Sequence, residues 1–214
     1  KNFPTLKRHG EFSGRANPCY LNPDIFLKSF LYPLTPHRER TGLIIFEFSR
    51  FYPRDYRYGR EFVSELDLFL SKLPTNEWDF GVEIRNPSLL QKAYFDTLER
   101  HSVAHVYNQW QRMPDLSEQL KLRPPTPDNS PTGCRLLLKR GRDYDGAVES
   151  FAPYDGIKEI QKGVRHAAAK LISDLKRQPS GRRTYLYANN RLEGNAVATI
   201  EAILALVENQ DAAS

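Results

Sequence analysis

The sequence predicts an α/β fold built on a parallel sheet. Five short apolar segments recur along the 214 residues, and most are followed by a segment whose apolar residues have helical spacing. Such alternation is typical of βα units, whose strands are parallel and whose crossovers are right-handed. Two architectures fit this pattern, an open doubly wound sheet and a large part of a (β/α)8 barrel. No Gly-x-Gly-x-x-Gly or Gly-x-x-x-x-Gly-Lys loop follows any strand, which removes the usual nucleotide-binding reasons for the open sheet.

The first predicted elements follow an irregular polar stretch at residues 1–19. The Asn-Pro-Asp sequence at 22–24 predicts a helix start, because it supplies an N-cap, a proline at the first helical position and an acid in the first turn. Pro33 and Pro36 are expected to close this helix. The continuous apolar run Leu43–Phe48 predicts a strand that is covered on both faces.

The middle of the chain continues the alternation. Apolar residues at helical spacing predict helices over 62–73 and 89–98, and the segments Phe80–Arg85 and Val103–Tyr107 predict the second and third strands. Residues 111–133 then interrupt the pattern with four prolines after a short helical piece, which predicts a long Pro-rich surface loop.

The last third of the chain predicts two further strands and two further helices. The strands are expected at Arg135–Lys139 and Thr184–Ala188, and the helices at Gly156–Lys176 and Asn195–Glu208. Residues 1–214 therefore predict a single α/β domain with five parallel strands.

Composition bounds the class of protein. The net charge is +5, but residues 1–60 carry 11 basic and 5 acidic side chains, whereas residues 61–214 are nearly balanced. A basic N-terminal part suits a nucleic-acid binder, a pocket for a small anion, or a merely basic surface. Neither Cys19 nor Cys134 lies in a disulfide framework or a metal-binding spacing. Because the sequence contains no apolar run of about 18 residues and no signal peptide, we expect a cytoplasmic protein without a membrane span.

Glu83 and Arg85 are the strongest candidates for catalytic residues. They lie two positions apart at the end of the second predicted strand, so their side chains share a face. Ligands of parallel sheets bind outside the carboxyl ends of the strands. We expect both side chains to point into the barrel and to be mostly buried, with Glu83 hydrogen-bonded. They form either an acid/base and ligand-orienting pair or a structural ion pair.

Three further polar residues lie at or near strand ends. Glu47 is near the end of the first strand, and His105 and Asn108 are in or just beyond the third. Asn108 is a candidate substrate ligand. A hard-metal site built from Glu47, Glu83 and His105 is conceivable, but no short-range ligand spacing supports it. We therefore predict no metal ligand, and the sequence names no cofactor.

The loop Arg50–Arg60 interleaves four arginines with aromatic residues. Arginine and tyrosine together suit phosphate contact and base stacking, which would make this loop a nucleic-acid surface. Its alternative interpretation is a solvated loop whose arginines extend along the surface. In either case it follows a strand end and is a plausible wall of a pocket.

The last two strands are each followed by residues that could hold an anion. The first is followed by Arg140, and the second by Asn189, Asn190 and, at a helix start, Gly194. In TIM barrels the loops after strands seven and eight often bind phosphate together with a helix N-terminus. Their alternative role is to turn the chain and cap the helix. We name these four residues, with Asn108, as candidate substrate ligands.

The chain resembles the YecE-like proteins, a domain family of unknown function with a TIM-barrel fold. The resemblance rests on Asp79–Asn86, similar to the family's VE-x-R strand, and on the two adjacent asparagines with Gly194 and Ala196, similar to its NN-x-x-x-G-x-A strand end. It covers most of residues 41–208. The chain departs from the family pattern at three positions, where Leu138 and Arg140 replace an Arg and a His, and Thr199 replaces an Asn.

The resemblance implies that this chain supplies roughly strands four to eight of a TIM barrel, so that residues 1–214 form a single, incomplete barrel domain. It also implies a distant relation to metal-dependent sugar isomerases, which is an analogy of fold and not of function. Two functions stay open. One is a barrel enzyme with isomerase-like or hydrolase-like acid/base chemistry on a small polar, sugar-like or phosphorylated substrate. The other is a protein that binds nucleic acid or another anion without catalysis.

Overall fold

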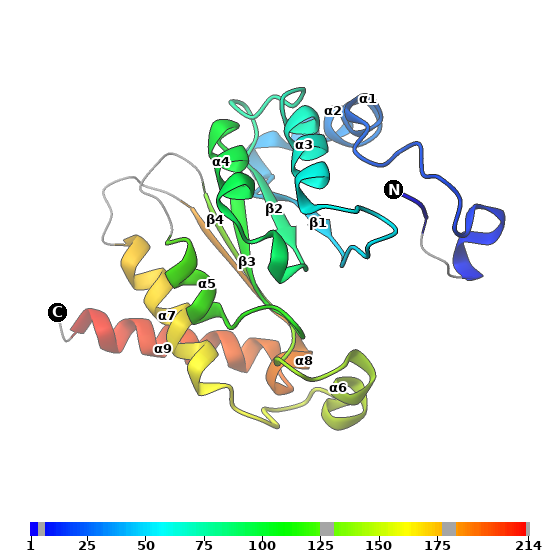
Figure 1. Ribbon diagram of the computed structural model, residues 1–214. Helices are drawn as coiled ribbons and strands as arrows, with labels where there is room; N and C mark the ends of the chain where they lie inside the picture. Colours follow the sequence, from blue (N-terminus) through cyan, green and yellow to red (C-terminus); the bar gives the residue numbers. More distant parts are fainter. Residues whose placement is uncertain (4–6, 125–130, 177–182, 213–214) are drawn as a thin grey trace.

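The computed structural model describes residues 1–3, 7–124, 131–176 and 183–212. Its core is a five-stranded, all-parallel sheet in which the strands follow one another in the order of the sequence (Figure 1). The strands are β1 (Ile44–Phe48), β2 (Phe80–Ile84), β3 (Ala104–Gln109), β4 (Thr132–Leu136) and β5 (Thr184–Ala188). The predicted α/β class and the five predicted strands are therefore confirmed.

Helices connect the strands and lie outside the sheet (Figure 1). The α-helices are α1 (Pro23–Phe26), α2 (Tyr32–Leu34), α3 (Gly59–Leu70), α4 (Lys92–Arg100), α5 (Leu116–Leu122), α6 (Tyr144–Phe151), α7 (Lys162–Lys176), α8 (Asn190–Glu193) and α9 (Ala196–Ala212). Short 3₁₀-helices occupy Lys7–Phe12, Thr35–Arg40 and Pro87–Leu89, and a π-helical turn occupies Leu27–Leu31. In the part of the chain that the structure describes, no helix has the length and apolar character needed to cross a membrane.

The helix that begins at residue 23 is longer than predicted. The side chain of Asn22 caps it by accepting a 3.1 Å hydrogen bond from the Ile25 amide, as the sequence predicts. Pro33 does not close it, since the backbone stays helical through α2. A π-helical turn and a 3₁₀-helix carry the helical run on to Arg40.

Strand β4 begins at Thr132 and ends at Leu136, three residues earlier than predicted at each end, so the predicted loop 111–133 is shorter. The prediction was wrong because Pro-Thr-Gly at 131–133 has the composition of a turn. Glycine is needed at 133 for packing, since a Cβ there would lie 2.7 Å from Leu43 and 3.1 Å from Val106. Part of that loop, residues 125–130, lies outside the described residues.

The last third of the chain differs from the prediction at two places. Asp143 caps the unpredicted helix α6 by accepting from the Gly146 amide. Helix α7 begins at Lys162 and not at Gly156, because the amides of Lys158 and Glu159 donate to the carbonyl of Glu193. Side-chain caps and contacts between distant segments thus set both boundaries, and neither is visible in local periodicity.

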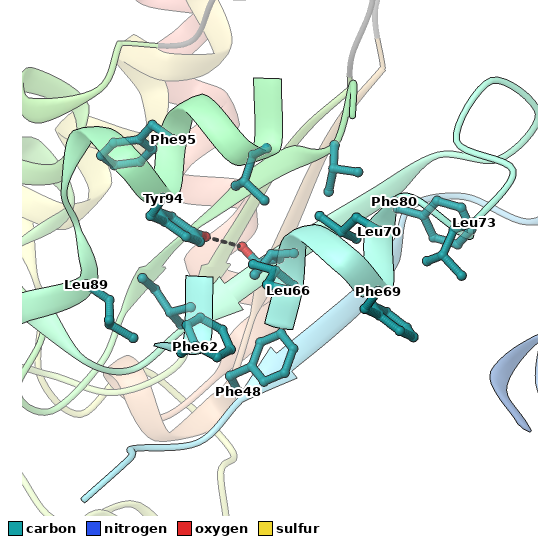
Figure 2. Packing of buried hydrophobic residues seen from close by; sticks show 14 of the residues in the cluster. Phe48, Phe62, Leu66, Phe69, Leu70, Leu73, Phe80, Leu89, Tyr94 and Phe95 are labelled. Atoms are coloured by element: carbon teal, nitrogen blue, oxygen red, sulfur yellow. Dashed lines mark hydrogen bonds between the residues drawn. The ribbon is translucent and has the colours of Figure 1, made fainter. Parts of the chain in front are cut away.

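The larger core lies between the sheet and its helices. Phe62 and Leu66 of α3 are fully buried, and the Phe62 ring packs 5.0 Å from that of Phe48 on β1. Figure 2 shows these side chains with Phe80 and with Tyr94 of α4 in one cluster. Burial of each such side chain contributes about 1.5–3 kcal/mol. A second cluster joins β3, β4, α7 and α9.

The other face of the sheet, called here the inner face, is curved. It carries Leu43, Val106 and Tyr185 in a small apolar cluster at the amino ends of the strands. A Cβ added to Gly42, just before β1, would lie 2.7 Å from the ring of Tyr185 on β5. Since β1 and β5 are at opposite edges of the sheet, the sheet must curl strongly, as in a barrel wall.

Candidate functional site

Four charged residues meet on the inner face near the carboxyl ends of the strands. Glu47 of β1 and Glu83 of β2 are paired in the strand register, Arg85 directly follows β2, and Arg135 lies in β4. Alternation along a strand places them there, since their sequence neighbours Phe46, Val82, Ile84, Cys134 and Leu136 pack on the helix side. The predicted shared face of Glu83 and Arg85 is therefore confirmed.

The four side chains form one ion-pair network, called here the inner network. Oε1 of Glu83 accepts a 3.3 Å hydrogen bond from Nε of Arg85, and its Oε2 contacts Nη1 of Arg135. Oε2 of Glu47 lies 2.8 Å from Nη2 of Arg85 and 3.2 Å from Nη1 of Arg135. Each guanidinium is thus shared between both carboxylates, and the four charges cancel.

Burial differs within the inner network. The Glu83 side chain is 0% exposed, whereas that of Glu47 is 33% exposed. Burial raises the pKa of Glu83, although Arg135 and Arg85 offset part of this effect. Burial alone would lower the pKa of Arg135, but the adjacent Glu83 raises it overall. The buried Glu83 therefore forms ion pairs with both arginines, and Glu47 is the carboxylate that is more accessible to solvent.

An open hollow of about 380 Å³ lies over the inner network. It is lined by Leu43, Ile45, Glu47, Arg135 and Tyr187. Arg85 does not line the hollow, and its guanidinium carbon lies 4.0 Å from the ring centroid of Trp110. The hollow thus presents a carboxylate, a guanidinium and a phenol next to apolar side chains, which is the donor set of a site for a small polar molecule.

Asn108 lies beside the inner network. It is fully buried on β3, in register with Arg135 on β4, and its Nδ2 donates a 3.1 Å hydrogen bond to the Ile84 carbonyl. Within the described residues its Oδ1 has no hydrogen-bond partner. A buried acceptor without a partner is uncommon and costs stability. Because Asn108 is fully buried and does not line the hollow, its role as a substrate ligand stays a prediction.

Arg140 lies apart from the inner network. Its Nη1 is 3.3 Å from Oε2 of Glu118 and 3.7 Å from Oδ2 of Asp115, both at the start of α5, and its side chain is 54% exposed. It lines a separate cavity of about 320 Å³ with Lys139 and Gln161. Its charge is therefore already balanced by acids of α5.

Asn189, Asn190 and Gly194 organise the loop between β5 and α9. The Asn189 side chain accepts from the amide of Arg191, and that of Asn190 accepts a 2.7 Å hydrogen bond from the amide of Ala196. Gly194 ends α8 with φ 111°, and a Cβ there would lie 2.5 Å from the carbonyl of Gly156. The amide oxygens of both asparagines thus bind loop backbone, and glycine is required sterically at 194.

Two features of the structure were missed from the sequence. The sequence indicates Arg135 only as the start of a strand, although a charge among apolar strand residues is the same signal that indicates Glu83. Glu193 is fully buried and accepts from Nη2 of Arg165 at 2.7 Å and from the hydroxyl of Thr199 at 2.8 Å. Thr199, a departure from the family pattern, therefore satisfies a buried carboxylate.

The conceivable metal set of Glu47, Glu83 and His105 is not brought together. His105 faces α4, where its Nδ1 lies 3.0 Å from the hydroxyl of Tyr94, and the two glutamates face the opposite side of the sheet. Across residues 1–3, 7–124, 131–176 and 183–212, no group of three His, Cys, Asp or Glu side chains could hold a metal ion.

Comparisons place this fold among known proteins. No curated protein matches the chain. A DUF72 family protein from Thermotoga maritima has a similar structure, with a TM-score of 0.59 and 18% identity over 88% of this chain. A DUF72 family protein from Enterococcus faecalis has a TM-score of 0.59 and 12% identity over 89% of this chain. The chain spans 65% of the first structure's length and 68% of the second.

The family model agrees with these structural matches and with the resemblance seen in the sequence. Residues 5–214 match the model described as "Protein of unknown function DUF72". The five parallel strands alternating with helices are the fold shared with the two solved DUF72 structures. This chain therefore belongs to the DUF72 family.

Proposed function

We propose that the inner network and the hollow above it form a binding site for a small, polar, anionic molecule, such as a sugar phosphate, with acid/base chemistry of the isomerase or hydrolase kind. The observation that supports this most is that the guanidinium of Arg135 lies at the border of the hollow and is shared by two carboxylates. The guanidinium of Arg135 can donate two parallel N–H hydrogen bonds to an anion in the hollow, and its position is already fixed by the carboxylates.

The network supports distinct roles for its members. Glu83 has both oxygens on guanidiniums and is fully buried, so it is a positioning residue for Arg85 and Arg135. Glu47 lines the hollow and can exchange a proton with a bound molecule. Glu47 and an incoming anion compete for Arg135, so Glu47 also controls how tightly an anion binds in the hollow.

Opposite effects of two substitutions test this proposal. Sulfate and glucose 6-phosphate are titrated calorimetrically into the full chain and into Glu47→Gln and Arg135→Gln. The proposal predicts tighter binding to Glu47→Gln, because the competing charge is gone, and at least about tenfold weaker binding to Arg135→Gln, the loss of one charged hydrogen bond.

Two controls keep this test informative. Arg100→Gln removes a guanidinium that pairs with Asp67 on the helix side and leaves anion affinity unchanged. If Arg135→Gln does not fold, Tyr187→Phe is the second variant. It removes a hydroxyl group from the hollow, keeps the aromatic ring, and weakens anion binding. Equal affinity in every variant would contradict the proposal and leave the inner network with a structural role.

We also propose that the five strands correspond to strands four to eight of a TIM barrel. Their sequential order, the strong curl of the sheet and the similarity to longer DUF72 chains support this correspondence. The inner network would then lie at the carboxyl-terminal mouth, where barrel enzymes have their active sites. An experimental structure of a longer family member with the inner network away from the mouth would overturn it.

A further inference from the structure

The segment that follows β1 and runs into the first turn of α3 displays two tyrosines, each flanked by two arginines. This segment, residues 50–60, is called here the Arg–Tyr loop. Tyr52 is 48% exposed, and the guanidinium carbons of Arg50 and Arg54 each lie 5.4 Å from its ring centroid. Tyr58 is 46% exposed and has Arg57 and Arg60 at 5.3 and 4.8 Å. The Arg–Tyr loop therefore contains two copies of the same arrangement, an exposed tyrosine ring between two guanidinium groups.

The backbone of the Arg–Tyr loop is held in place on both sides. Asn86, which directly follows Arg85, accepts from the amide of Phe51 at 2.7 Å and donates to its carbonyl at 3.1 Å. Asp55 accepts from the amide of Tyr52, and Glu61 accepts from the amides of Arg57 and Tyr58. The exposed side chains thus extend from a constrained backbone, which reduces the entropy lost on binding a partner.

The same contacts leave the arginines without acidic partners. The loop contains four arginines and one acid, Asp55, and that acid is bonded to backbone. Glu65, on the facing helix α3, contacts the hydroxyl of Tyr56. In the part of the chain that the structure describes, none of the four guanidiniums forms a salt bridge, and all four side chains are exposed. The loop is therefore a concentrated positive patch.

We propose that the Arg–Tyr loop binds single-stranded nucleic acid. Arginines that lack acid partners suit phosphates, and half-exposed tyrosine rings suit the faces of unpaired bases. A duplex hides its base faces, and an acidic peptide has no planar groups at the spacing of nucleotides, so neither uses the tyrosines. This surface is distinct from the hollow of the proposed function, although both lie at the carboxyl ends of the strands.

The experiment measures binding of a labelled 12-nucleotide oligothymidylate to the full chain by fluorescence anisotropy, at several salt concentrations. An abasic strand of the same length is the second probe. If four phosphates are contacted, the slope of log K against log salt is about −2.8, from roughly −0.7 for each phosphate on a single strand. Arg54→Gln/Arg57→Gln then reduces the slope by about half.

The tyrosines separate nucleic-acid binding from attraction to any polyanion. Tyr52→Ala/Tyr58→Ala is expected to weaken oligothymidylate binding at least about tenfold, the effect of losing base stacking. The same variant binds the abasic strand as the parent does, and Tyr52→Phe/Tyr58→Phe retains oligothymidylate binding. Tyr32→Ala, which removes another exposed tyrosine, and Arg40→Gln/Lys72→Gln, which removes two exposed charges elsewhere, serve as matched controls.

Three results would overturn this inference. They are oligothymidylate affinity equal to that of the abasic strand, equal losses in the loop variants and their matched controls, or no binding at low salt. None of these results bears on the anion site, since sulfate binding in the hollow is measured separately and does not require the Arg–Tyr loop.

Discussion

The Oε2 atom of Glu47 lies 3.2 Å from Nη1 of Arg135, although the two residues are 88 positions apart in the chain. They come from β1 and β4, which are not neighbours in the sheet. Only a sheet that curls onto itself brings these strands within ion-pair distance. The contact therefore reports both the barrel-like curvature and the composition of the candidate site.

Removal of Arg135 is expected to destabilise the protein strongly. Arg135→Met leaves the buried carboxylate of Glu83 with Arg85 as its remaining partner. Breaking a buried ion pair from one side costs about 3–5 kcal/mol. Urea unfolding followed by circular dichroism measures this cost as a change in the free energy of unfolding.

The matched double variant separates burial of a lone charge from loss of packing. Glu83→Leu/Arg135→Met removes both charges of the pair, and is expected to recover most of the stability lost in Arg135→Met. If the double variant is less stable than the single one, the carboxylate of Glu83 is not the source of the cost.

Asn86 is expected to hold the Arg–Tyr loop. Asn86→Ala removes two hydrogen bonds to the backbone of Phe51. This loss is expected to lower the free energy of unfolding by about 1–3 kcal/mol. Trypsin cleaves after arginine, so the variant is predicted to be cut faster at Arg50 and Arg54 in a limited digestion. Asn195→Ala, which alters the start of α9, leaves these cleavage rates unchanged. A cleavage pattern identical to that of the parent chain would show that the loop is held by other contacts.

Glu159 is expected to make stability depend on acid pH. Hydrogen bonds from Lys139, at 2.5 Å, and from Arg142 lower the pKa of Glu159 from 4.5 to about 2. A carboxyl group whose pKa is lower in the folded state stabilises the fold above its ordinary pKa, and this contribution is lost as the pH falls from 4.5 towards 2.

The variant Glu159→Gln checks that prediction. Its melting temperature is expected to be below that of the parent at pH 7, and the two are expected to converge as the pH approaches 2. The exposed Glu149→Gln is the control and follows the parent at every pH. If the difference in melting temperature between Glu159→Gln and the parent were the same at every pH, Lys139 and Arg142 would not be lowering the pKa of Glu159.

His105 is expected to stay neutral in mildly acidic solution. Burial lowers the pKa of His105 to about 3, and the nearby Arg123 adds to this effect. Because the unfolded chain protonates at its ordinary value near 6.5, His105 stabilises the fold above that pH, and the contribution is lost as the pH falls towards 3. Imidazole ¹⁵N shifts at pH 5 should therefore be those of a neutral ring, and shifts of a protonated ring would contradict its shielding.

The sequence predicts some elements well because local chemistry determines them. Strand β5 has the predicted bounds, since its apolar run ends at two asparagines. The shared face of Glu83 and Arg85 follows from strand alternation alone. The start of β4 could not be predicted locally, because Gly133 is required by Leu43 and Val106 from other strands.

The candidate site shows the same division. Glu83 and Arg85 come from one strand and are found by their spacing, but their partners Glu47 and Arg135 depend on the curl of the whole sheet. Conversely, Asn189 and Asn190 were singled out as ligands because of their position. Their binding to the amides of Arg191 and Ala196 is a tertiary detail that local sequence does not distinguish from ligand binding. Their role towards a substrate stays a prediction.

Competition between a bound anion and Glu47 for Arg135 tests the central claim most directly. Sulfate is titrated calorimetrically into the parent chain, into Glu47→Gln, into Arg135→Gln and into the double variant. The account predicts that Glu47→Gln binds sulfate more tightly than the parent chain does. It also predicts that the gain from Glu47→Gln is smaller in the Arg135→Gln background, where the contested guanidinium is absent. Equal sulfate affinity of Glu47→Gln and the parent chain, or the same gain in both backgrounds, would contradict the account.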